Sequence, residues 1–133
     1  MKQAKIDSVN VLVVEDSGVA SRIIAQMLAD LGAGRVLTAN NGASALKILK
    51  ETSTDIDICL CDIEMPVMGG YEFIRRIRYG TVPKYKDIPI LVLTSMDTEK
   101  NVKKSRIHRI NGFMIKPPTP EDLAREIRQI LGL

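Results

Sequence analysis

The sequence predicts an α/β protein in which five parallel strands alternate with five helices. Two patterns in the sequence lead to this prediction. Short, nearly continuous apolar runs are typical of strands that are covered on both faces. These runs alternate with segments whose apolar residues recur at helical spacing. Such alternation favours a parallel sheet with helices on both of its faces.

The expected strands are the five apolar runs, at residues 9–14, 35–39, 56–62, 88–94 and 112–116. Right-handed crossovers between successive strands leave few possible topologies. We expect the flavodoxin-like order 2-1-3-4-5, because this order makes the first and third strands neighbours at the switch point of the sheet. The predicted fold is therefore a flavodoxin-like (βα)5 domain.

The expected helices follow each strand and carry recognisable end signals. Ser17 is the expected N-cap of the first helix, which Gly32 closes. Further helices are expected after Gly42 and after Gly70, and a poorly patterned one lies within residues 97–110. Thr119 caps the last helix, with Pro120 at its first position. The loop at residues 78–87 is the longest expected connection.

Composition limits the class of protein. The 133 residues are 45% hydrophobic and 26% charged, which suits one domain with a single core. Residues 1–8 are expected to form a loose N-terminal tail, without the apolar core of a signal peptide. The two cysteines, Cys59 and Cys61, are interpreted as small core residues in a reducing cytoplasm. A net charge of +3 does not by itself indicate nucleic acid, and no apolar run is long enough to span a membrane.

Polar residues stand at the carboxyl ends of four expected strands, where ligands bind in open α/β sheets. These residues are Glu15 and Asp16, Asp62, Thr94 and Lys116. Each has a plain explanation when taken alone: a helix N-terminus, a turn, a strand threonine and a solvated loop lysine. Because all of them converge on one edge of the sheet, we interpret them instead as the residues of a functional site. Neighbouring carboxylates repel one another, and Mg²⁺ with oxygen ligands relieves that repulsion.

The hydroxyl and the ammonium suit the oxygens of a phosphoryl group, and Asp62 would be the nucleophile that forms an aspartyl phosphate. Two other functions stay open at this point. A metal-dependent phosphatase could use Asp62 as its nucleophile and Glu64 as a second acid. A binding module without phosphorylation could contact nucleic acid through the basic residues of the 98–109 segment.

Four segments, VLVVEDS, CDIEMPVMGG, LVLTS and MIKPP, resemble in order and spacing the motifs of the receiver domain of two-component response regulators, of the chemotaxis-receiver kind. The resemblance covers nearly the whole chain. It implies that Asp62 is the phosphoacceptor and that Asp16 binds Mg²⁺ directly. Glu15 would hold the metal through water, and the backbone carbonyl of Glu64 would complete the metal site.

The same resemblance implies a switch. Thr94 would hold the phosphoryl group, as would the invariant lysine, Lys116. Phe113 would turn inward on activation, and the Lys116–Pro117 bond would be cis. The donor would be a sensor histidine kinase or a histidine phosphotransfer protein. The altered face, formed by the fourth helix, fifth strand and fifth helix, would signal to a downstream protein target or a tethered output domain. Neither nucleic acid nor a membrane is expected as a partner, and the domain would catalyse only its own phosphorylation and dephosphorylation.

Overall fold

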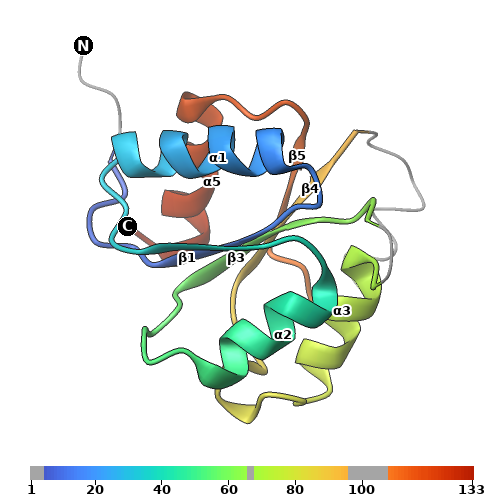
Figure 1. The fold of residues 1–133 in the computed structure, drawn as a ribbon. Helices are drawn as coiled ribbons and strands as arrows, with labels where there is room; N and C mark the ends of the chain where they lie inside the picture. Colours follow the sequence, from blue (N-terminus) through green and yellow to red (C-terminus); the bar gives the residue numbers. More distant parts are fainter. Residues whose placement is uncertain (1–4, 66–67, 96–107) are drawn as a thin grey trace.

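The computed structural model describes residues 5–65, 68–95 and 108–133. Its centre is a five-stranded parallel sheet in the order β2-β1-β3-β4-β5, as predicted (Figure 1). The strands are β1 (Val11–Val14), β2 (Val36–Ala39), β3 (Ile58–Asp62), β4 (Ile90–Thr94) and β5 (Gly112–Ile115). All five lie within or close to the apolar runs of the sequence.

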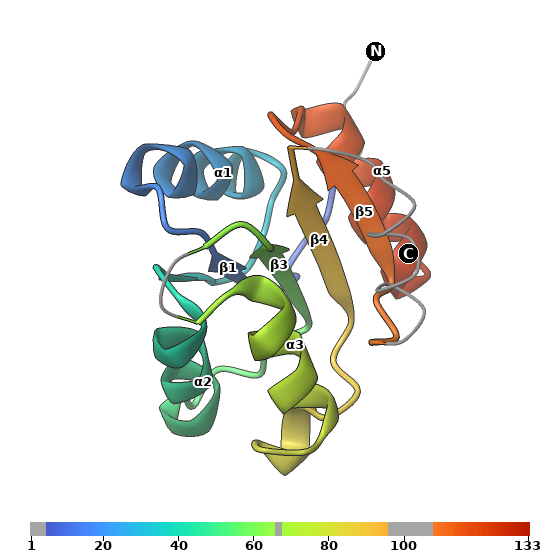
Figure 2. The same ribbon diagram turned by 90° about the vertical axis from the view of Figure 1, so that its right-hand side faces the viewer.

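Helices cover both faces of the sheet (Figure 2). One face is covered by α1 (Gly18–Asp30) and α5 (Pro120–Leu131), and the other by α2 (Gly42–Glu51) and α3 (Gly70–Arg78). A short 3-10 helix, η1 (Pro83–Tyr85), follows α3. The helix expected within residues 97–110 falls mostly outside the described residues.

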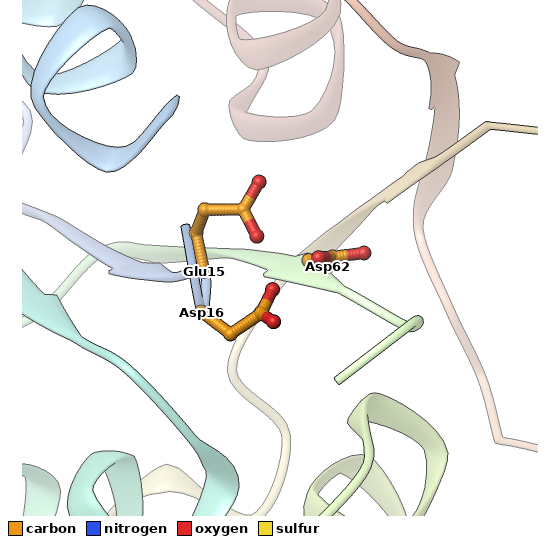
Figure 3. A group of neighbouring side chains, drawn as sticks. All are labelled: Glu15, Asp16 and Asp62. Carbon is orange, nitrogen blue, oxygen red and sulfur yellow. The ribbon is translucent and has the colours of Figure 1, made fainter. Parts of the chain in front are cut away.

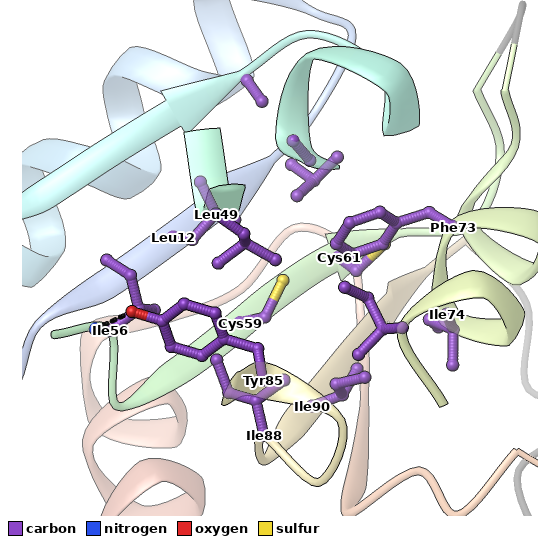
Figure 4. Close-up of a cluster of buried hydrophobic side chains, with 14 of the residues drawn as sticks. Leu12, Leu49, Ile56, Cys59, Cys61, Phe73, Ile74, Tyr85, Ile88 and Ile90 are labelled. Carbon is purple, nitrogen blue, oxygen red and sulfur yellow. Dashed lines mark hydrogen bonds between the residues drawn. The ribbon is translucent and has the colours of Figure 1, made fainter. Parts of the chain in front are cut away.

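Two hydrophobic cores follow from the alternation of side chains along the strands. Leu12, Cys59 and Val92 face α2 and α3, and they share one core with Phe73 of α3. Their neighbours in sequence, such as Val13 and Leu60, face α1 and α5. Figure 4 shows part of the first core, in which Cys59 and Cys61 are buried as free thiols, as predicted.

Side-chain caps fix where the helices begin. The hydroxyls of Ser17 and Thr119 accept backbone N–H groups of the first turns of α1 and α5, at 3.2 and 3.1 Å, which confirms both predicted caps. Asn41 caps α2 through its side-chain oxygen, 2.8 Å from the amide of Ser44. Asparagine is common both at helix N-caps and in turns, so residue type alone does not identify Asn41 as a cap.

The expectation for one irregular segment needs correction, and another segment is more ordered than a plain loop. The described part of the expected loose tail is docked, because Ile6 is fully buried and its amide donates to the carbonyl of Leu31 at 2.9 Å. The 78–87 connection contains η1, and it buries Tyr85 against the first core. In both cases one large apolar side chain fixes a segment whose other residues are mostly polar or small.

Among the described residues, none of the helices has the length and apolar character needed to cross a membrane.

Candidate functional site

Three carboxylates meet at the carboxyl edge of the sheet. Parallel pairing sets Val14 beside Cys61, so the next residues in the two strands, Glu15 and Asp62, are also neighbours. Glu15, Asp16 and Asp62 each offer an oxygen, and these three oxygens lie within 4.8 Å of one another. Figure 3 shows Glu15 and Asp16 extending from the end of β1 toward the side on which Asp62 lies. The cluster predicted from the sequence is therefore present.

Lys116 is the cation that compensates these acids. Its Nζ lies 3.0 Å from Asp62 Oδ1 and 3.6 Å from Glu15 Oε1. Burial alone would lower the pKa of Lys116, but the hydrogen bond to Asp62 and the charges of Asp62 and Glu15 raise that pKa above its usual value. The side chain is therefore a firmly charged ammonium, placed between two buried carboxylates.

Glu15 is an acid of this cluster whose pKa is strongly raised. It is almost fully buried, and this desolvation raises its pKa to about 7, with further increases from the hydrogen bond to Asp62 and from the charge of Asp62. The positive charge of Lys116 opposes the shift without cancelling it. The charge of Lys116 is thus insufficient to offset the burial of Glu15 and its interactions with Asp62.

The donor set fits a divalent cation. Glu15 Oε2 and Asp62 Oδ2 are buried and have no hydrogen-bond partner among the described residues. Buried carboxylate oxygens without a partner are costly. A hard cation such as Mg²⁺ takes oxygen ligands and keeps several waters, so it would satisfy both atoms with few protein ligands.

Glu64 and Thr94 lie on the other side of Asp62. The backbone amide of Glu64 donates to Asp62 Oδ1 at 2.9 Å, which fixes that oxygen. The Glu64 carboxylate accepts from the hydroxyls of Ser95, at 2.7 Å, and of Thr94, at 3.3 Å. The sequence analysis did not single out Ser95, although its position directly after Thr94 at a strand end was the available signal.

Phe113 lies in β5, away from the cluster of acids. Its register partner is Val92, two residues before Thr94 in β4, so Phe113 and Thr94 face the same side of the sheet. Phe113 is half-buried against the first core. The Lys116–Pro117 bond is cis, as predicted.

A cleft of about 510 Å³ opens beside Glu15 and Asp16, between the start of α1 and the ends of β2 and the loop that follows it. Its other lining residues are mainly polar: Gly18, Ser21, Arg22, Thr38, Ala39, Asn40 and Ser44. Glu15 and Asp16 therefore border this cleft, whereas Asp62 is not among its lining residues.

A doubly covered parallel sheet whose edge carries buried acids, a lysine and a threonine defines a class of α/β protein built to handle a phosphoryl group. Comparison with known proteins gives the family. Residues 11–128 match the family model described as the response regulator receiver domain, and the chain belongs to that family. It is a phosphoacceptor signalling domain. This family membership argues against the two other functions that the sequence left open, a phosphatase and a nucleic-acid-binding module.

Individual relatives agree with this assignment. The chain is 33% identical to a chemotaxis protein CheY homolog of Campylobacter jejuni, over 91% of each chain. The crystal structure of the chemotaxis protein CheY4 of Vibrio cholerae superposes with a TM-score of 0.84 at 31% identity, covering 93% of this chain and 99% of that one. The receiver domain of a sensor histidine kinase from Pseudomonas aeruginosa superposes with a TM-score of 0.81 at 27% identity, covering 95% of this chain and 99% of that one. That structure was solved with a magnesium ion coordinated in its active site cleft.

Proposed function

We propose that Asp62 accepts a phosphoryl group from a sensor histidine kinase or a histidine phosphotransfer protein. The observation that carries this proposal is the position of Asp62, which is buried, 3.0 Å from Lys116 Nζ and grouped with Glu15 and Asp16. Two buried carboxylates, Glu15 and Asp62, rarely lie side by side without a ligand to bind, because such charges repel.

Glu15, Asp16, Asp62 and the backbone carbonyl of Glu64 are the proposed holders of Mg²⁺. When bound, this ion would neutralise negative charge on the transferring group and on the carboxylates. Among the described residues, the acidic oxygens without a partner support this role.

In the proposed transfer, a carboxylate oxygen of Asp62 forms a bond to phosphorus. The bond from phosphorus to the donor breaks, and its electron pair stays with the donor's leaving group. Lys116 faces the acceptor from 3.0 Å and is placed to stabilise negative charge on a phosphoryl oxygen. The hydroxyl of Thr94 can donate to a second phosphoryl oxygen once it leaves the Glu64 carboxylate.

The proposed output begins with Thr94. When its hydroxyl turns toward the phosphoryl group, the space that it leaves lies on the face of the sheet that Phe113 shares. An inward turn of Phe113 would then change the surface of β5, and with it the face offered to a downstream target or a tethered output domain. The shared face and the half-buried position of Phe113 support this step.

Intact-mass spectrometry after incubation with a small acyl phosphate tests the proposal. The wild-type chain should gain one phosphoryl group only when Mg²⁺ is present, and Asp62→Asn should gain none. Equal labelling of the two proteins would contradict the assignment of Asp62. Continuous turnover of a small phosphate ester, in place of one stoichiometric addition, would instead favour the phosphatase.

A further inference from the structure

Another pocket lies at the C-terminal end of α3. It is lined by Arg75, Arg78, Tyr79, His108 and Arg109, and it has a volume of about 280 Å³. We call it the arginine pocket. The helix α3 starts just beyond the carboxyl edge of the sheet and is nine residues long, about 13 Å at 1.5 Å per residue. The arginine pocket is therefore at the opposite end of α3 from Asp62.

Arg78 builds the inner wall of the arginine pocket. Its Nε donates to the carbonyl of His108 at 3.1 Å, and its Nη2 donates to the carbonyl of Arg109 at 3.1 Å. Its Nη1 donates to the carbonyl of Lys86 at 2.9 Å, and Nη2 also approaches Asn111 Oδ1 at 3.5 Å. The guanidinium thus joins α3 to the segment that leads into β5, and its fixed position gives the pocket a rigid base.

The positive charge of the arginine pocket is incompletely balanced. Arg78 is bonded to neutral oxygens and forms no ion pair within the described part of the chain. Glu72 is shared between Arg75 and Arg76, and Asp87 pairs with Arg109. Among the residues that the structure describes here, four arginines therefore stand against two carboxylates, an excess of two positive charges. Burial and the nearby Arg109 lower the pKa of Arg78, and the charge of Asp87 opposes this shift without cancelling it.

The rim of the arginine pocket is open to a partner. The side chains of Arg75 and Arg109 are 52% and 56% exposed, and both form only surface ion pairs, which are weak and easily exchanged. Tyr79 is 81% exposed and offers an apolar ring beside these cations. Aromatic and arginine side chains together are typical of the residues that dominate protein–protein interfaces.

We propose that the arginine pocket docks an acidic segment of a partner protein. Carboxylate side chains of that segment would pair with Arg75 and Arg109, and a neighbouring apolar side chain would pack on Tyr79. A compact phosphate is a poorer occupant, because the described contacts of Arg78 already use most of its N–H donors and bidentate recognition needs a free guanidinium fork. This site is separate from the phosphoacceptor and does not depend on it.

Fluorescence anisotropy with a short labelled peptide of aspartate and glutamate around one leucine tests the proposal on the full chain. The acidic peptide should bind, and the matched asparagine and glutamine peptide should not. Arg109→Gln should weaken binding at least about threefold, as expected for the loss of one partly exposed ion pair. Tyr79→Ala should weaken it as well. Asp62→Asn should bind like the wild type, which separates this site from phosphorylation.

Arg125→Gln is the matched control, because Arg125 is a 63% exposed arginine that pairs with Asp122 on α5. The affinity of the Arg125→Gln protein for the acidic peptide should stay within about twofold of the wild-type affinity, since a distant surface charge acts mainly through screened long-range attraction. Equal weakening by Arg125→Gln and Arg109→Gln would overturn the proposal, because attraction would then be set by net charge alone. Loss of binding on Lys103→Gln or Lys104→Gln, with no change on Arg109→Gln, would overturn it too. Competition by inorganic phosphate at millimolar concentration would show a small-anion site instead and would also contradict it.

Discussion

At the scale of single residues, the protonation of Glu15 makes both folding stability and metal binding depend on pH. Its folded-state pKa of about 7 lies above the ordinary value of 4.5, so a proton on Glu15 stabilises the folded protein. In the absence of a metal, this stabilisation is fully present below pH 4.5 and is lost as the pH rises toward 7. A bound divalent cation requires the deprotonated carboxylate, so protons and Mg²⁺ compete at this residue.

We therefore predict that Mg²⁺ affinity rises with pH until about pH 7 and then levels off. With one proton displaced per ion, the rise is at most about tenfold per pH unit. Calorimetric titration at several pH values measures it. Glu15→Gln has no proton to displace, so its affinity should be weaker and much flatter over the same range. An equally steep profile in Glu15→Gln would show that another group is responsible.

Glu64 gives a second prediction at this scale. Its carboxylate occupies the hydroxyls of Thr94 and Ser95, and it would also be close to a water attacking the phosphorylated Asp62. We predict that Glu64→Ala lengthens the half-life of the phosphoryl group by about threefold to tenfold, less than the 10²–10⁴ of a committed general base. Decay of the phosphorylated mass with time measures the half-life. Faster decay in Glu64→Ala would contradict this role.

Met96, two residues after Thr94 in the sequence, is the other residue that we expect to flank the path of this water. Because methionine forms only weak hydrogen bonds, Met96→Ala should change the half-life little. Met96 lies outside the described residues, so this prediction rests on the sequence alone.

At the scale of elements, Tyr85 shows how a short helix ties two loops together. Its hydroxyl accepts from the amide of Ile56 at 3.1 Å and donates to the carbonyl of Thr54 at 3.2 Å, while its ring is buried (Figure 4). The 3-10 helix η1 is thereby fastened to the segment that enters β3.

Tyr85→Phe should lower the free energy of unfolding by about 1–2 kcal/mol, because it removes both hydrogen bonds and leaves a buried amide without a partner. Urea unfolding followed by circular dichroism measures the change. Tyr79→Phe is the matched control, since Tyr79 is 81% exposed and its change should stay within about 0.5 kcal/mol. Equal effects of the two substitutions would show that the Tyr85 hydroxyl is not important for stability.

The start of α3 depends on a glycine. A Cβ on Gly70 would lie 2.5 Å from both the carbonyl oxygen of Asp62 and the Cα of Ile63. The first residue of α3 therefore packs directly on the backbone that carries the proposed phosphoacceptor. Any side chain at this position must displace either α3 or the end of β3.

Gly70→Ala should therefore cost about 1–3 kcal/mol of stability and also slow phosphorylation, because Asp62 would move. Gly18→Ala is the control, since nothing lies within 4 Å of a Cβ there, and it should be neutral or stabilising by up to about 1 kcal/mol. Thermal melts and the rate of phosphoryl uptake give the two readouts. Normal uptake in a folded Gly70→Ala protein would mean that this packing does not position the site.

At the scale of the whole molecule, strand ends brought the site residues together, and this was predictable. Apolar runs predict all five strands, and the predicted order 2-1-3-4-5 makes Glu15 and Asp62 neighbours, as they are in the structure. Ser17 and Thr119 were identified as caps because their hydroxyls precede clear helical patterns. The features fixed by local pattern and topology are those that the sequence predicts well.

Features that depend on long-range contacts were not predictable. Ile6 is buried only because the chain before β1 passes close to the end of α1, and no local sequence pattern predicts this contact. The contact of Ser95 with Glu64 joins residues 31 apart, and the bonds of Arg78 to residues 108–111 join α3 to the start of β5. These contacts require the assembled fold, because each joins segments that are distant in the sequence.

The central claim is that the phosphoryl group is bound by Asp62 and by no other acid of the cluster. Borohydride reduces an aspartyl phosphate to homoserine, so it marks the phosphorylated residue permanently. The chain should be phosphorylated with a small acyl phosphate and Mg²⁺, reduced with borohydride, digested and sequenced by mass spectrometry. We predict homoserine at position 62 only, and none when Mg²⁺ is omitted. Homoserine at position 16, or the absence of any modified residue in a protein that consumes the donor, would contradict the account.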